Sequence, residues 1–482
     1  MTARSASNQE KLYIGGDWKS GADYIEVEDL ADGGIFAQVT AATPEDALDA
    51  LAAAQQAQAA MSDLSIVERA DWLSAIADGI EDRKPELTEI IVREAGKPIS
   101  SARGEVESAA ERFRRAVEEV RALDGEYLEG TTDGHEGWQA IVKPEPVGTV
   151  LCITPYNYPL ATTALQVAPA LAAGNSTILK PATKTPISAA VLSEVVVESA
   201  EAVGIELPDG AFSFVPGRAD EIGDVLAGDD RIDAIAMTGS TGAGKHVAGV
   251  SGMVELHMEL GGNAPAVVFP DADLEDVADG CTAGSFKYAG QRCSAVSRIL
   301  AHDDVHDAVV DRIAESMDGW ETGDLFDPDT AVGPLISEEQ ADWVEELIDD
   351  AVAKGATLVR GGQRDGQAIE PTLLADVPAD ARIVHEEQFG PVAAVTRFED
   401  ETEALAIANG GDLGLDAAVY TSEYDRAMRV ADALEAGAVR INGPPSHGLG
   451  DIPFGGMKDS GIGREGIGRT IDAFTQTKSI IL

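Results

Sequence analysis

The spacing of apolar and polar residues over the first third of the chain predicts helices. The run 43–61 begins with a threonine N-cap, a proline at the first helical position and two acids in the first turn, and it continues as an Ala/Leu-rich segment. Ser65 and Glu68 form a capping box before a second amphipathic run. Two further runs end at Gly96 and Gly125, because glycine tolerates the left-handed conformation that closes a helix.

From Trp138 onward, short apolar strands alternate with helical runs, which indicates a parallel sheet covered by helices on both faces. A second series of the same kind begins after Glu259, so the pattern predicts two doubly wound α/β units joined near residues 259–263. The predicted strands lie at 138–146, 147–155, 176–181, 212–217, 233–239, 264–269, 295–301, 417–421 and 438–442. The predicted helices lie at 159–174, 187–204, 219–228, 242–250, 274–290, 305–317, 337–355 and 425–437. The apolar, β-prone segment 475–482 is expected to pair with another strand, in this chain or in a partner subunit.

The charge of the chain excludes some partners. Asp and Glu number 85 against 35 Lys and Arg, a formal net charge of -50. A surface of this sign repels nucleic acid, whose binding needs basic patches. The acids are spread through every segment and 44% of the residues are hydrophobic, so the chain is expected to fold. An acidic coat of this kind resembles that of proteins from salt-rich cytoplasms, where screening weakens the repulsion between like charges.

Cysteine usage and the N-terminal segment predict the compartment. Cys152, Cys281 and Cys293 are too few for a disulfide framework in 482 residues, and they suit a reducing cytosol. The N-terminal segment lacks the apolar run of a signal peptide. No run reaches the roughly 20 apolar residues of a membrane span. We therefore expect a soluble, cytoplasmic protein with no membrane partner.

The segment 288–296, with the sequence YAGQRCSAV, is a candidate catalytic site. Cys293 follows Gly290 and Arg292 and precedes a strand-like run. This order places a thiol on a tight, non-helical turn beside a cation, a setting that favours the nucleophilic thiolate. A free cysteine that is only a small buried apolar residue is the alternative, and the residues elsewhere in the chain have to separate the two interpretations.

A glycine-rich turn at 239–245, GSTGAGK, follows a predicted strand and opens a predicted helix. It nearly matches the phosphate-binding loop G-x-x-x-x-G-K-[ST], but His246 replaces the hydroxyl residue that would hold magnesium. The glycines let the backbone approach a ligand, and amides at a helix start accept an anion. We expect a phosphate contact here and no ATPase, with a plain strand-to-helix turn as the alternative.

Further polar residues follow apolar strands, where open α/β sheets place ligands. Asn157 in PYNYP is either a turn former or an amide donor to an oxyanion. Lys180 in ILKPA brings a cation to the same edge. Glu259 in MELGG is costly to bury unless it is paired or functional. Glu387 and Phe389 in EEQFGPV offer one carboxylate and one aromatic ring.

Seven motifs occur together: GQRC, PYNYP, ILKPA, MTGST, MELGG, EEQFGPV and PFGGMKDSGIGREG. With them the chain resembles the NAD(P)-dependent, non-phosphorylating aldehyde dehydrogenases from about residue 10 onward. The resemblance implies an aldehyde dehydrogenase-like fold, with two doubly wound α/β domains plus a small β oligomerisation extension. It places an NAD(P)-binding domain at 1–122 and 142–260, a catalytic domain at 261–455, and oligomerisation segments at 123–141 and 468–482. It also implies a homodimer or homotetramer.

The same resemblance assigns roles to individual residues. Cys293 corresponds to the nucleophile, the Asn157 amide to an oxyanion donor beside the Cys293 backbone N–H, and Glu259 to the base that activates water. The cofactor-binding positions correspond to Lys180, Thr183, Gly239, Ser240, Glu387 and Phe389. The implied activity is oxidation of an aldehyde to the carboxylic acid through a cysteinyl thiohemiacetal and a thioester, without a metal.

Thr183 bears on the choice of cofactor. In the family this position faces the adenosine ribose, where a glutamate repels a 2′-phosphate. Threonine removes that repulsion, and Lys180 and Lys184 supply positive charge nearby. We therefore expect NADP to be accepted at least as well as NAD, the alternative being that Thr183 only caps a turn.

The substrate is expected to be a small polar or anionic aldehyde, because Tyr158 and Arg292 flank the catalytic positions. Family members that act on glyceraldehyde 3-phosphate share these neighbours and use further cations. Arg114 corresponds to one such position, with a mere surface residue as the alternative, and His447 stands in the region of another. A semialdehyde, a hydroxy-aldehyde and glyceraldehyde 3-phosphate all remain candidates.

Two other functions remain open at this point. A cofactor-independent cysteine thioesterase or esterase would use Cys293 and Glu259, but it would not explain Lys180 and the turn at Gly239. A catalytically silent binding protein on the same fold would be expected to lose the thiol. Glu259 argues against CoA-acylating or phosphorylating relatives, which lack the acid that releases the product.

Overall fold

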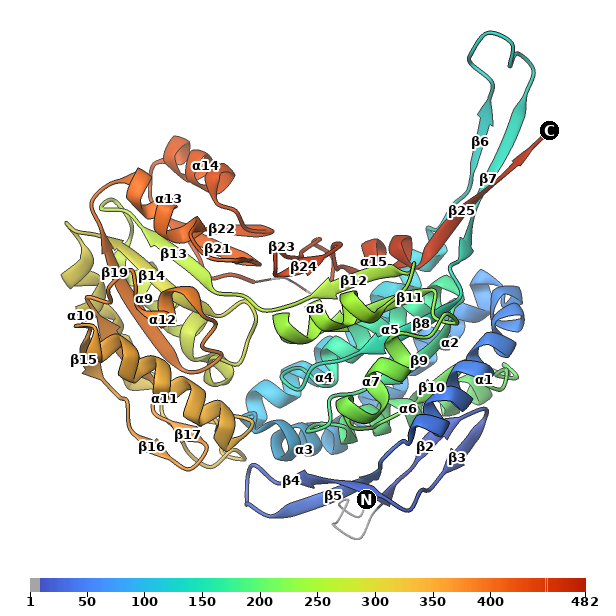
Figure 1. Cartoon of the computed structure of the whole chain (residues 1–482), viewed down its shortest axis with the longest axis horizontal. Coiled ribbons are helices and arrows are strands. Elements are labelled where there is room, and N and C mark those ends of the chain that lie inside the picture. Colours follow the sequence, from blue (N-terminus) through green and yellow to red (C-terminus); the bar gives the residue numbers. More distant parts are fainter. Residues whose placement is uncertain (1–8, 447, 449) are drawn as a thin grey trace.

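The computed structural model describes residues 9–446, 448 and 450–482 (Figure 1). Its first two helices start at the N-caps predicted from the sequence. The Thr43 hydroxyl accepts from the backbone N–H of Asp46, whose carboxylate accepts from the Thr43 N–H at 2.9 Å, and α1 (Pro44–Asp63) follows. Ser65 and Glu68 make the same reciprocal pair before α2 (Ile66–Asp82). Both predicted caps are confirmed.

Of the next two helices, the first ends as predicted and the second differs from the prediction at both ends. Helix α3 (Lys84–Ala95) ends as expected at Gly96, whose φ is +67°. Helix α4 (Ile99–Arg121) starts earlier than Gly104 and ends before Gly125. Pro98 takes the N-cap position, and a proline ahead of a helix restrains the chain without losing a helical hydrogen bond.

The helical prediction missed five strands ahead of α1. Gly15 and Gly16, with φ of +60° and +84°, turn the chain so that Leu12 pairs with Lys19. Strands of two or three residues are too short to show alternation, although YIEVE at 24–28 does alternate. The five strands are β1 (Gln9–Glu10), β2 (Leu12–Ile14), β3 (Asp17–Lys19), β4 (Tyr24–Glu28) and β5 (Ile35–Thr40).

The first large sheet has eight strands in the order β24-β12-β11-β8-β9-β10-β2-β3. The strands from β12 to β10 are parallel to one another, and β24 and β2 pair with them antiparallel. The strands not yet introduced are β8 (Thr149–Ile153), β9 (Ser176–Lys180), β10 (Phe212–Phe214), β11 (Ala234–Thr238), β12 (Glu255–Glu259) and β24 (Gly461–Ile462).

Helices cover both faces of this sheet, as predicted. Leu151 in β8 packs into a core with α1, α7 (Ala219–Ala227) and α8 (Thr241–Val250). Its neighbours Val150 and Cys152 point the other way, into a core with α2, α3, α4, α5 (Ala161–Ala173) and α6 (Ile187–Ala202). Because successive residues of a strand face opposite sides, this division shows that β8 is buried on both faces.

The second large sheet has seven strands in the order β15-β18-β19-β14-β13-β21-β22. In β13, Ala266 and Val268 face one core and Val267 faces the other, so this sheet is also covered twice. The strands are β13 (Ala264–Val268), β14 (Val296–His302), β15 (Thr357–Arg360), β18 (Thr372–Ala375), β19 (Val392–Phe398), β21 (Asp416–Tyr420) and β22 (Ala438–Ile441). The helices are α9 (Leu274–Phe286), α10 (His306–Ser316), α11 (Glu338–Ala353), α12 (Arg382–His385), α13 (Glu401–Asn409) and α14 (Tyr424–Ala433).

A three-stranded sheet projects from the body as an arm (Figure 1). It consists of β6 (Glu126–Glu129), β7 (Gln139–Pro146) and β25 (Thr475–Ile481), and the last of these pairs antiparallel with β7 from Thr475 opposite Pro146 to Ile481 opposite Ala140. The predicted strand at 475–482 is therefore confirmed, and its partner lies in the same chain. Helix α15 (Ile467–Ala473), just before it, packs on α4 and α5.

Smaller elements complete the fold. Strands β1, β5 and β4 form a separate sheet. Two antiparallel pairs join β16 (Arg364–Asp365) with β17 (Ala368–Ile369) in a hairpin, and β20 (Leu413–Gly414) with the distant β23 (Met457–Lys458). Short 3₁₀ turns lie at η1 (Lys287–Gly290) and η2 (Met317–Gly319). Within the described ranges, every helix is too short or too polar to cross a lipid bilayer.

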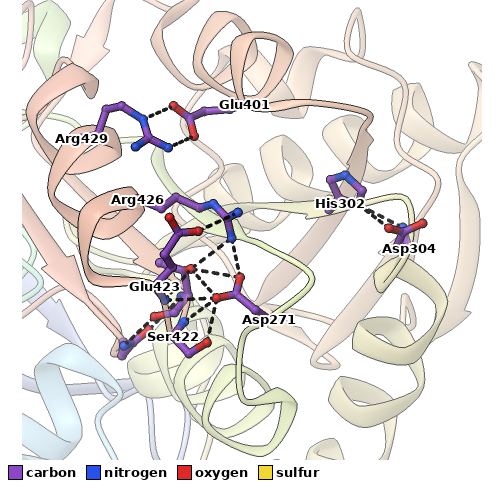
Figure 2. A network of polar contacts seen from close by, with 10 residues as sticks. Asp271, His302, Asp304, Glu401, Ser422, Glu423, Arg426 and Arg429 are labelled. Carbon is purple, nitrogen blue, oxygen red and sulfur yellow. Dashed lines mark hydrogen bonds and ion pairs between the residues drawn. The ribbon is translucent and has the colours of Figure 1, made fainter.

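Polar networks tie the surface helices of the second sheet to its strand ends, as Figure 2 shows. Asp271 follows β13 and accepts hydrogen bonds from the backbone N–H groups of Ser422 and Glu423, at 2.9 and 3.1 Å. Its other oxygen lies 2.6 Å from the Arg426 guanidinium. These bonds fix the start of α14 against the loop after β13.

Candidate active site

A cavity of about 530 Å³ opens at the C-terminal ends of β8, β9 and β11. The first sheet contributes the loops that follow these strands, and the second contributes Cys293 and the loop of Glu387 and Phe389. Open α/β sheets bind ligands at this edge. Of the residues predicted to act, the lining contains Asn157, Tyr158, Lys180, Thr183, Gly239, Ser240, Cys293, Glu387 and Phe389.

The segment before Cys293 is non-helical, as its sequence predicts. Helix α9 ends at Phe286 and does not continue to Gly290, because Tyr288, Ala289 and Gly290 have φ values of +56°, +51° and +69°. The left-handed conformation costs a residue with a side chain roughly 1–2 kcal/mol. Two such residues in succession therefore need anchors.

Hydrogen bonds from other parts of the chain supply those anchors. The Tyr288 hydroxyl donates to the carbonyl oxygen of Ala95, at the end of α3, at 2.9 Å. The Gln291 side chain accepts from the backbone N–H of Ile336 at 2.9 Å and donates to Pro334 O at 3.3 Å. The segment is thereby held from the α3 end on one side and from the loop before α11 on the other.

The cation beside Cys293 does not by itself produce a thiolate. Burial raises the pKa of the Cys293 thiol, and the carboxylates of Asp416, Glu387 and Glu259 raise it further, while Arg292 lowers it. The expectation drawn from Arg292 alone was therefore wrong, because desolvation and three nearby acids outweigh one guanidinium. A nearby base must remove the thiol proton when the sulfur reacts.

Asn157 is held with its amide beside the Cys293 segment. Its side chain is buried, and Nδ2 donates to the carbonyl oxygen of Gln291 at 2.9 Å. A primary amide carries two N–H groups, so one remains for a second acceptor. The backbone N–H of Cys293 has no acceptor among the described residues. The two free donors belong to residues that both line the cavity, as an oxyanion site requires.

Glu259, the last residue of β12, is buried, and within the described chain neither carboxylate oxygen makes a hydrogen bond. Burial raises its pKa well above the ordinary value, and the Glu465 carboxylate adds to the rise, while Arg464 opposes it. A carboxylate with a raised pKa is a stronger base. Gly455 leaves room for it, since a Cβ there would lie 2.7 Å from Glu259 Oε1.

The opposite end of the cavity has the groups that a nicotinamide dinucleotide needs. Lys180 ends β9, is buried, and has no ion pair among the described residues, and burial lowers its pKa to about 8. Gly239 and the N-cap Ser240 lead into α8, whose first turn contains no acid. The free ammonium and the amides at this helix start fit a diphosphate and its ribose.

Thr183 also lines the cavity, but its hydroxyl hydrogen already makes a hydrogen bond within the chain. The hydroxyl donates to the carbonyl oxygen of Gly217 at 3.3 Å. The predicted extra donor to a 2′-phosphate is thus absent in this arrangement, because a hydroxyl has one hydrogen to give. The other half of the prediction is unaffected: position 183 has no carboxylate that would repel a 2′-phosphate.

The loop after α12 brings Glu387 and Phe389 to the cavity. Glu387 Oε1 accepts from the backbone N–H of Gly262 at 2.9 Å, and burial raises its pKa to about 7. Phe389 has a φ of +47°, and its ring meets the edge of the Tyr156 ring at 5.9 Å between centroids. The loop therefore presents a carboxylate and an aromatic ring to the same cavity.

The predicted substrate residues separate into those near the cavity and those away from it. Tyr158 lines the cavity, and Arg292, beside Cys293, donates to Ser294 Oγ at 3.3 Å. Arg114 does not lie there: its side chain is 43% exposed and approaches Glu81 and Glu111 at 3.6 and 3.7 Å. Arg114 points outward from α4, so the alternative interpretation, a surface residue with no role in the site, fits the structure. His447 falls outside the described residues.

Over residues 18–480 the chain matches the model of the aldehyde dehydrogenase family. The chain is a member of this family. The NADP-dependent glyceraldehyde-3-phosphate dehydrogenase of Streptococcus equinus is 37% identical, over 98% of this chain and 99% of the relative. The 3-sulfolactaldehyde dehydrogenase of Priestia aryabhattai is 34% identical, over 100% of both chains. The crystal structure of the NADP-dependent glyceraldehyde-3-phosphate dehydrogenase of Bacillus halodurans C-125, complexed with NADP, superposes with a TM-score of 0.96, at 36% identity and 99% coverage of each chain.

This aldehyde dehydrogenase therefore catalyses the nicotinamide-dependent oxidation of an aldehyde to an acid. A cofactor-independent thioesterase and a silent binding protein are not favoured. The described residues of the dehydrogenase also contain no cluster of three or more metal-ligating side chains.

Sequence reasoning missed several residues of the dehydrogenase's site. Arg112, two positions before Arg114, donates to Ala161 O and has no ion pair among the described residues. Burial lowers the pKa of Arg112, while Glu465, Glu105 and Tyr158 raise it, so Arg112 lies near Tyr158, behind the residues that line the cavity. The helical spacing of α4 was the available signal, because residues two apart face different sides of a helix.

The sequence analysis also did not predict the indole and the side-chain amide that hold the Glu387 loop. Trp343 Nε1 donates to Glu387 O at 3.0 Å, and Gln340 Nε2 donates to Gln388 O and Phe389 O at 3.0 and 3.2 Å. Both residues lie on α11 and line the cavity. No local motif marks them.

Proposed function

We propose that the enzyme works by covalent catalysis at Cys293. The observation that carries the proposal is that the Cys293 thiol and a free amide N–H of Asn157 line one cavity, while the buried carboxylate of Glu259 is close enough to raise the pKa of that thiol. Glu259, whose raised pKa makes it a proton acceptor, takes the thiol proton as the sulfur bonds to the aldehyde carbon. The carbonyl oxygen becomes an oxyanion held by Asn157 Nδ2 and the Cys293 N–H.

The product is released in a second step. The nicotinamide, when bound, supplies the hydride acceptor that leaves a thioester on Cys293. After it has passed the thiol proton to solvent, Glu259 takes a proton from the water that attacks the thioester carbon. Cleavage of the C–S bond then releases the carboxylic acid and the Cys293 thiolate, which regains a proton from Glu259. Cys293→Ala tests the proposal: oxidation should be abolished while cofactor still binds. Substantial turnover in the folded variant would remove Cys293 from the mechanism.

We propose a small aldehyde with an anionic group as substrate. Arg112, Arg292 and Tyr158 lie at the same end of the site, and neither arginine has an ion pair among the described residues. Two relatives are named for aldehydes that carry a phosphate or a sulfonate. Guanidinium groups bind both anions through charge-assisted hydrogen bonds.

The substrate proposal is tested by comparing glyceraldehyde 3-phosphate with glyceraldehyde. The anionic substrate should have the higher kcat/KM, and Arg112→Gln should reduce that advantage by about 10–100-fold, since charged hydrogen bonds contribute about 1.5–3 kcal/mol. Arg114→Gln is the matched control from the outer face of the same helix, where no change is expected. Equal loss in both variants would contradict the assignment of Arg112.

We further propose NADP as the better cofactor. Lys180 offers an unpaired ammonium, and Thr183 places no carboxylate beside the adenosine ribose. Two of the relatives above are named as NADP-dependent. We also propose roles for the domains: the cofactor is bound by residues 1–122 and 142–260, and the nucleophile belongs to residues 261–455.

We also infer a homodimer or homotetramer in a salt-rich cytoplasm. The arm exposes apolar side chains of Tyr127, Leu128, Ile480, Ile481 and Leu482, a grouping that suits contact with a second copy. Because α15 packs on α4 and α5, the proposed C-terminal oligomerisation segment narrows from 468–482 to about 475–482, while 123–141 stays as predicted. Light scattering in molar KCl tests the assembly, and a monomer would contradict it.

A further inference from the structure

Lys97 is buried in the turn between α3 and α4, away from the cavity lining. Both its side chain and that of its ion-pair partner Glu105 are 1% exposed. The Lys97 ammonium lies 3.5 Å from the centroid of the Tyr158 ring and 4.3 Å from that of Tyr288. One buried cation therefore contacts two aromatic rings and one carboxylate.

The two rings belong to the two loops that carry the reacting groups. Tyr158 directly follows Asn157, and Tyr288 lies on the left-handed segment that leads to Cys293. The rings also meet edge to face, with 6.0 Å between their centroids. A displacement of the Lys97 ammonium would therefore change the packing of the Tyr158 and Tyr288 rings, one on each loop.

Glu105 extends the same contact to α5. Its Oε1 accepts from the backbone N–H groups of Leu160 and Ala161 at 3.0 and 3.1 Å, while Oε2 bonds to Lys97. The carboxylate thus caps the start of α5, immediately after the loop of Asn157. The ion pair fixes the Asn157 loop at its far end as well as through Tyr158.

We propose that Lys97 is a positioning residue, which with Glu105 holds the Tyr158 and Tyr288 rings so that the Asn157 amide and the Cys293 sulfur keep their mutual geometry. The proposal rests on Cys293 being the nucleophile, as proposed above. It concerns above all the step in which the sulfur bonds to the aldehyde carbon, because the amide and the sulfur must then meet a carbonyl group that is not yet attached to the enzyme.

A purely structural role explains this arrangement less well. Replacing a buried ion pair by apolar residues of similar volume is often neutral or stabilising, so stability does not require a charge here. The Lys97 ammonium is desolvated, and burial lowers its pKa to about 8 despite Glu105. A cation facing two rings does, however, orient both of them, and the Tyr288 backbone is held in a conformation that a residue with a side chain rarely adopts.

The test is the double variant Lys97→Met/Glu105→Gln, which removes both charges, keeps the side-chain volumes and retains a side-chain oxygen at position 105 to cap α5. Rapid mixing with aldehyde and NADP measures acylation as the first turnover of reduced cofactor. We expect acylation to slow by roughly 10–100-fold, the effect of a displacement of about 1 Å. The dissociation constant of NADP, measured by cofactor fluorescence, should be unchanged. An unchanged acylation rate in the folded variant would overturn the proposal.

The matched control is Arg83→Met/Glu194→Gln, which removes a partly buried ion pair of 2.6 Å between the α2–α3 junction and α6. We expect acylation as in wild type; a loss equal to that of the Lys97 variant would show a general effect of removing a pair and would overturn the proposal. Cys293→Ala distinguishes failure of the proposed nucleophile from failure of the proposed positioning role. If it keeps turnover, the nucleophile assignment fails, whereas if it is inactive and the Lys97 variant is fast, only the positioning role fails.

A second test leaves the buried pair untouched. Tyr288→Phe keeps a ring near the ammonium and loses only the hydrogen bond to Ala95 O, whereas Tyr288→Leu loses both. Both variants retain the same backbone strain. We expect Tyr288→Leu to acylate about tenfold more slowly than Tyr288→Phe, a difference of about 1.4 kcal/mol. Equal rates in the two variants would overturn the proposal.

Discussion

NADP affinity should fall as the pH rises through 8, because Lys180 loses its charge there. The ammonium is buried at the end of β9 without an ion pair among the described residues, and burial alone lowers its pKa to about 8, from an ordinary value of 10.5. Its protonated form is the one that attracts phosphate and donates to ribose hydroxyls. Affinity is therefore complete well below pH 8 and falls progressively as the pH rises through 8.

The size of the effect follows from the two pKa values. A bound dinucleotide restores the pKa of Lys180 toward 10.5, so the dissociation constant rises in proportion to one plus the ratio of neutral to charged Lys180 in the free enzyme. The expected rise is about twofold at pH 8 and about elevenfold at pH 9, relative to the plateau at lower pH. The second figure corresponds to about 1.4 kcal/mol.

Calorimetric titration with NADP between pH 7.5 and 9.5, in molar KCl, measures this change. The window lies above the pKa of about 7 to which burial raises Glu387, so that carboxylate is mostly ionised throughout. Titration at pH 9 in two buffers of different ionisation enthalpy should also detect uptake of nearly one proton on binding. In Lys180→Met, binding should be weaker and independent of pH. A flat wild-type profile to pH 9.5, or an equal slope in Lys180→Met, would refute the reasoning.

Four further predictions concern other parts of the molecule. Glu259→Gln should slow release of the acid by about 10²–10⁴-fold, the usual contribution of a general base, and should slow the first turnover less. A burst of reduced cofactor should therefore still precede a slow steady state, and loss of that burst in the folded variant would contradict the larger role given to Glu259 in product release. Thr183→Glu should raise the KM for NADP by about 30-fold or more and leave the KM for NAD nearly unchanged. The reason is that a like charge within about 5 Å of the 2′-phosphate costs about 2 kcal/mol after screening. Equal changes for both cofactors would contradict the role of this position. Burial raises the pKa of Asp271, but hydrogen bonds from Ser422 and Thr421 outweigh it and lower the value to about 2. Its contribution to stability, about 1 kcal/mol after discounting for solvent exposure, is complete above the unfolded value of 3.8 and is lost as the pH falls toward 2, so Asp271→Asn should lower Tm at pH 7 and leave it unchanged at pH 2. Finally, with a net charge of -50, Tm should rise between dilute buffer and molar KCl, where the Debye length is about 3 Å; an equal Tm would show that the acidic coat does not limit stability.

Local rules predicted the elements whose own residues determine them. The caps at Thr43 and Ser65 depend on side chains three residues away, and the structure has both. The strand that ends at Lys180 was recognisable because buried strands are continuous apolar runs. Strand β12, which ends at Glu259, was not predicted, because ELHME is not a run of that kind. The strands before α1 were missed, since a pair such as Leu12 and Lys19 is fixed by a two-glycine turn and by packing, and not by alternation.

The site was predictable where motifs carry it and unpredictable where folding brings distant residues together. Cys293 and Asn157 stand in short motifs, and the structure places both at the cavity. The thiol pKa was misjudged because Arg292 is its neighbour in sequence, whereas Asp416 and Glu387 reach it only through the fold. Arg114 was chosen by correspondence alone, and it points outward from α4, whereas Arg112 on another face of the helix lies near Tyr158.

The pairing of β25 with β7 also governs when the protein can complete its fold during synthesis. Thr475 to Ile481 close a sheet with residues 140–146, and Asn175 Nδ2 donates to Phe474 O at 3.0 Å, across 299 positions of sequence. Strand β24 likewise joins the first sheet beside Glu259 only after residue 462 has left the ribosome. Synthesis proceeds at about 5–20 residues per second, so the edge of the first sheet next to Glu259 stays unpaired for many seconds. A nascent chain stalled before residue 461 should therefore be inactive and prone to aggregation, however well its earlier helices are formed.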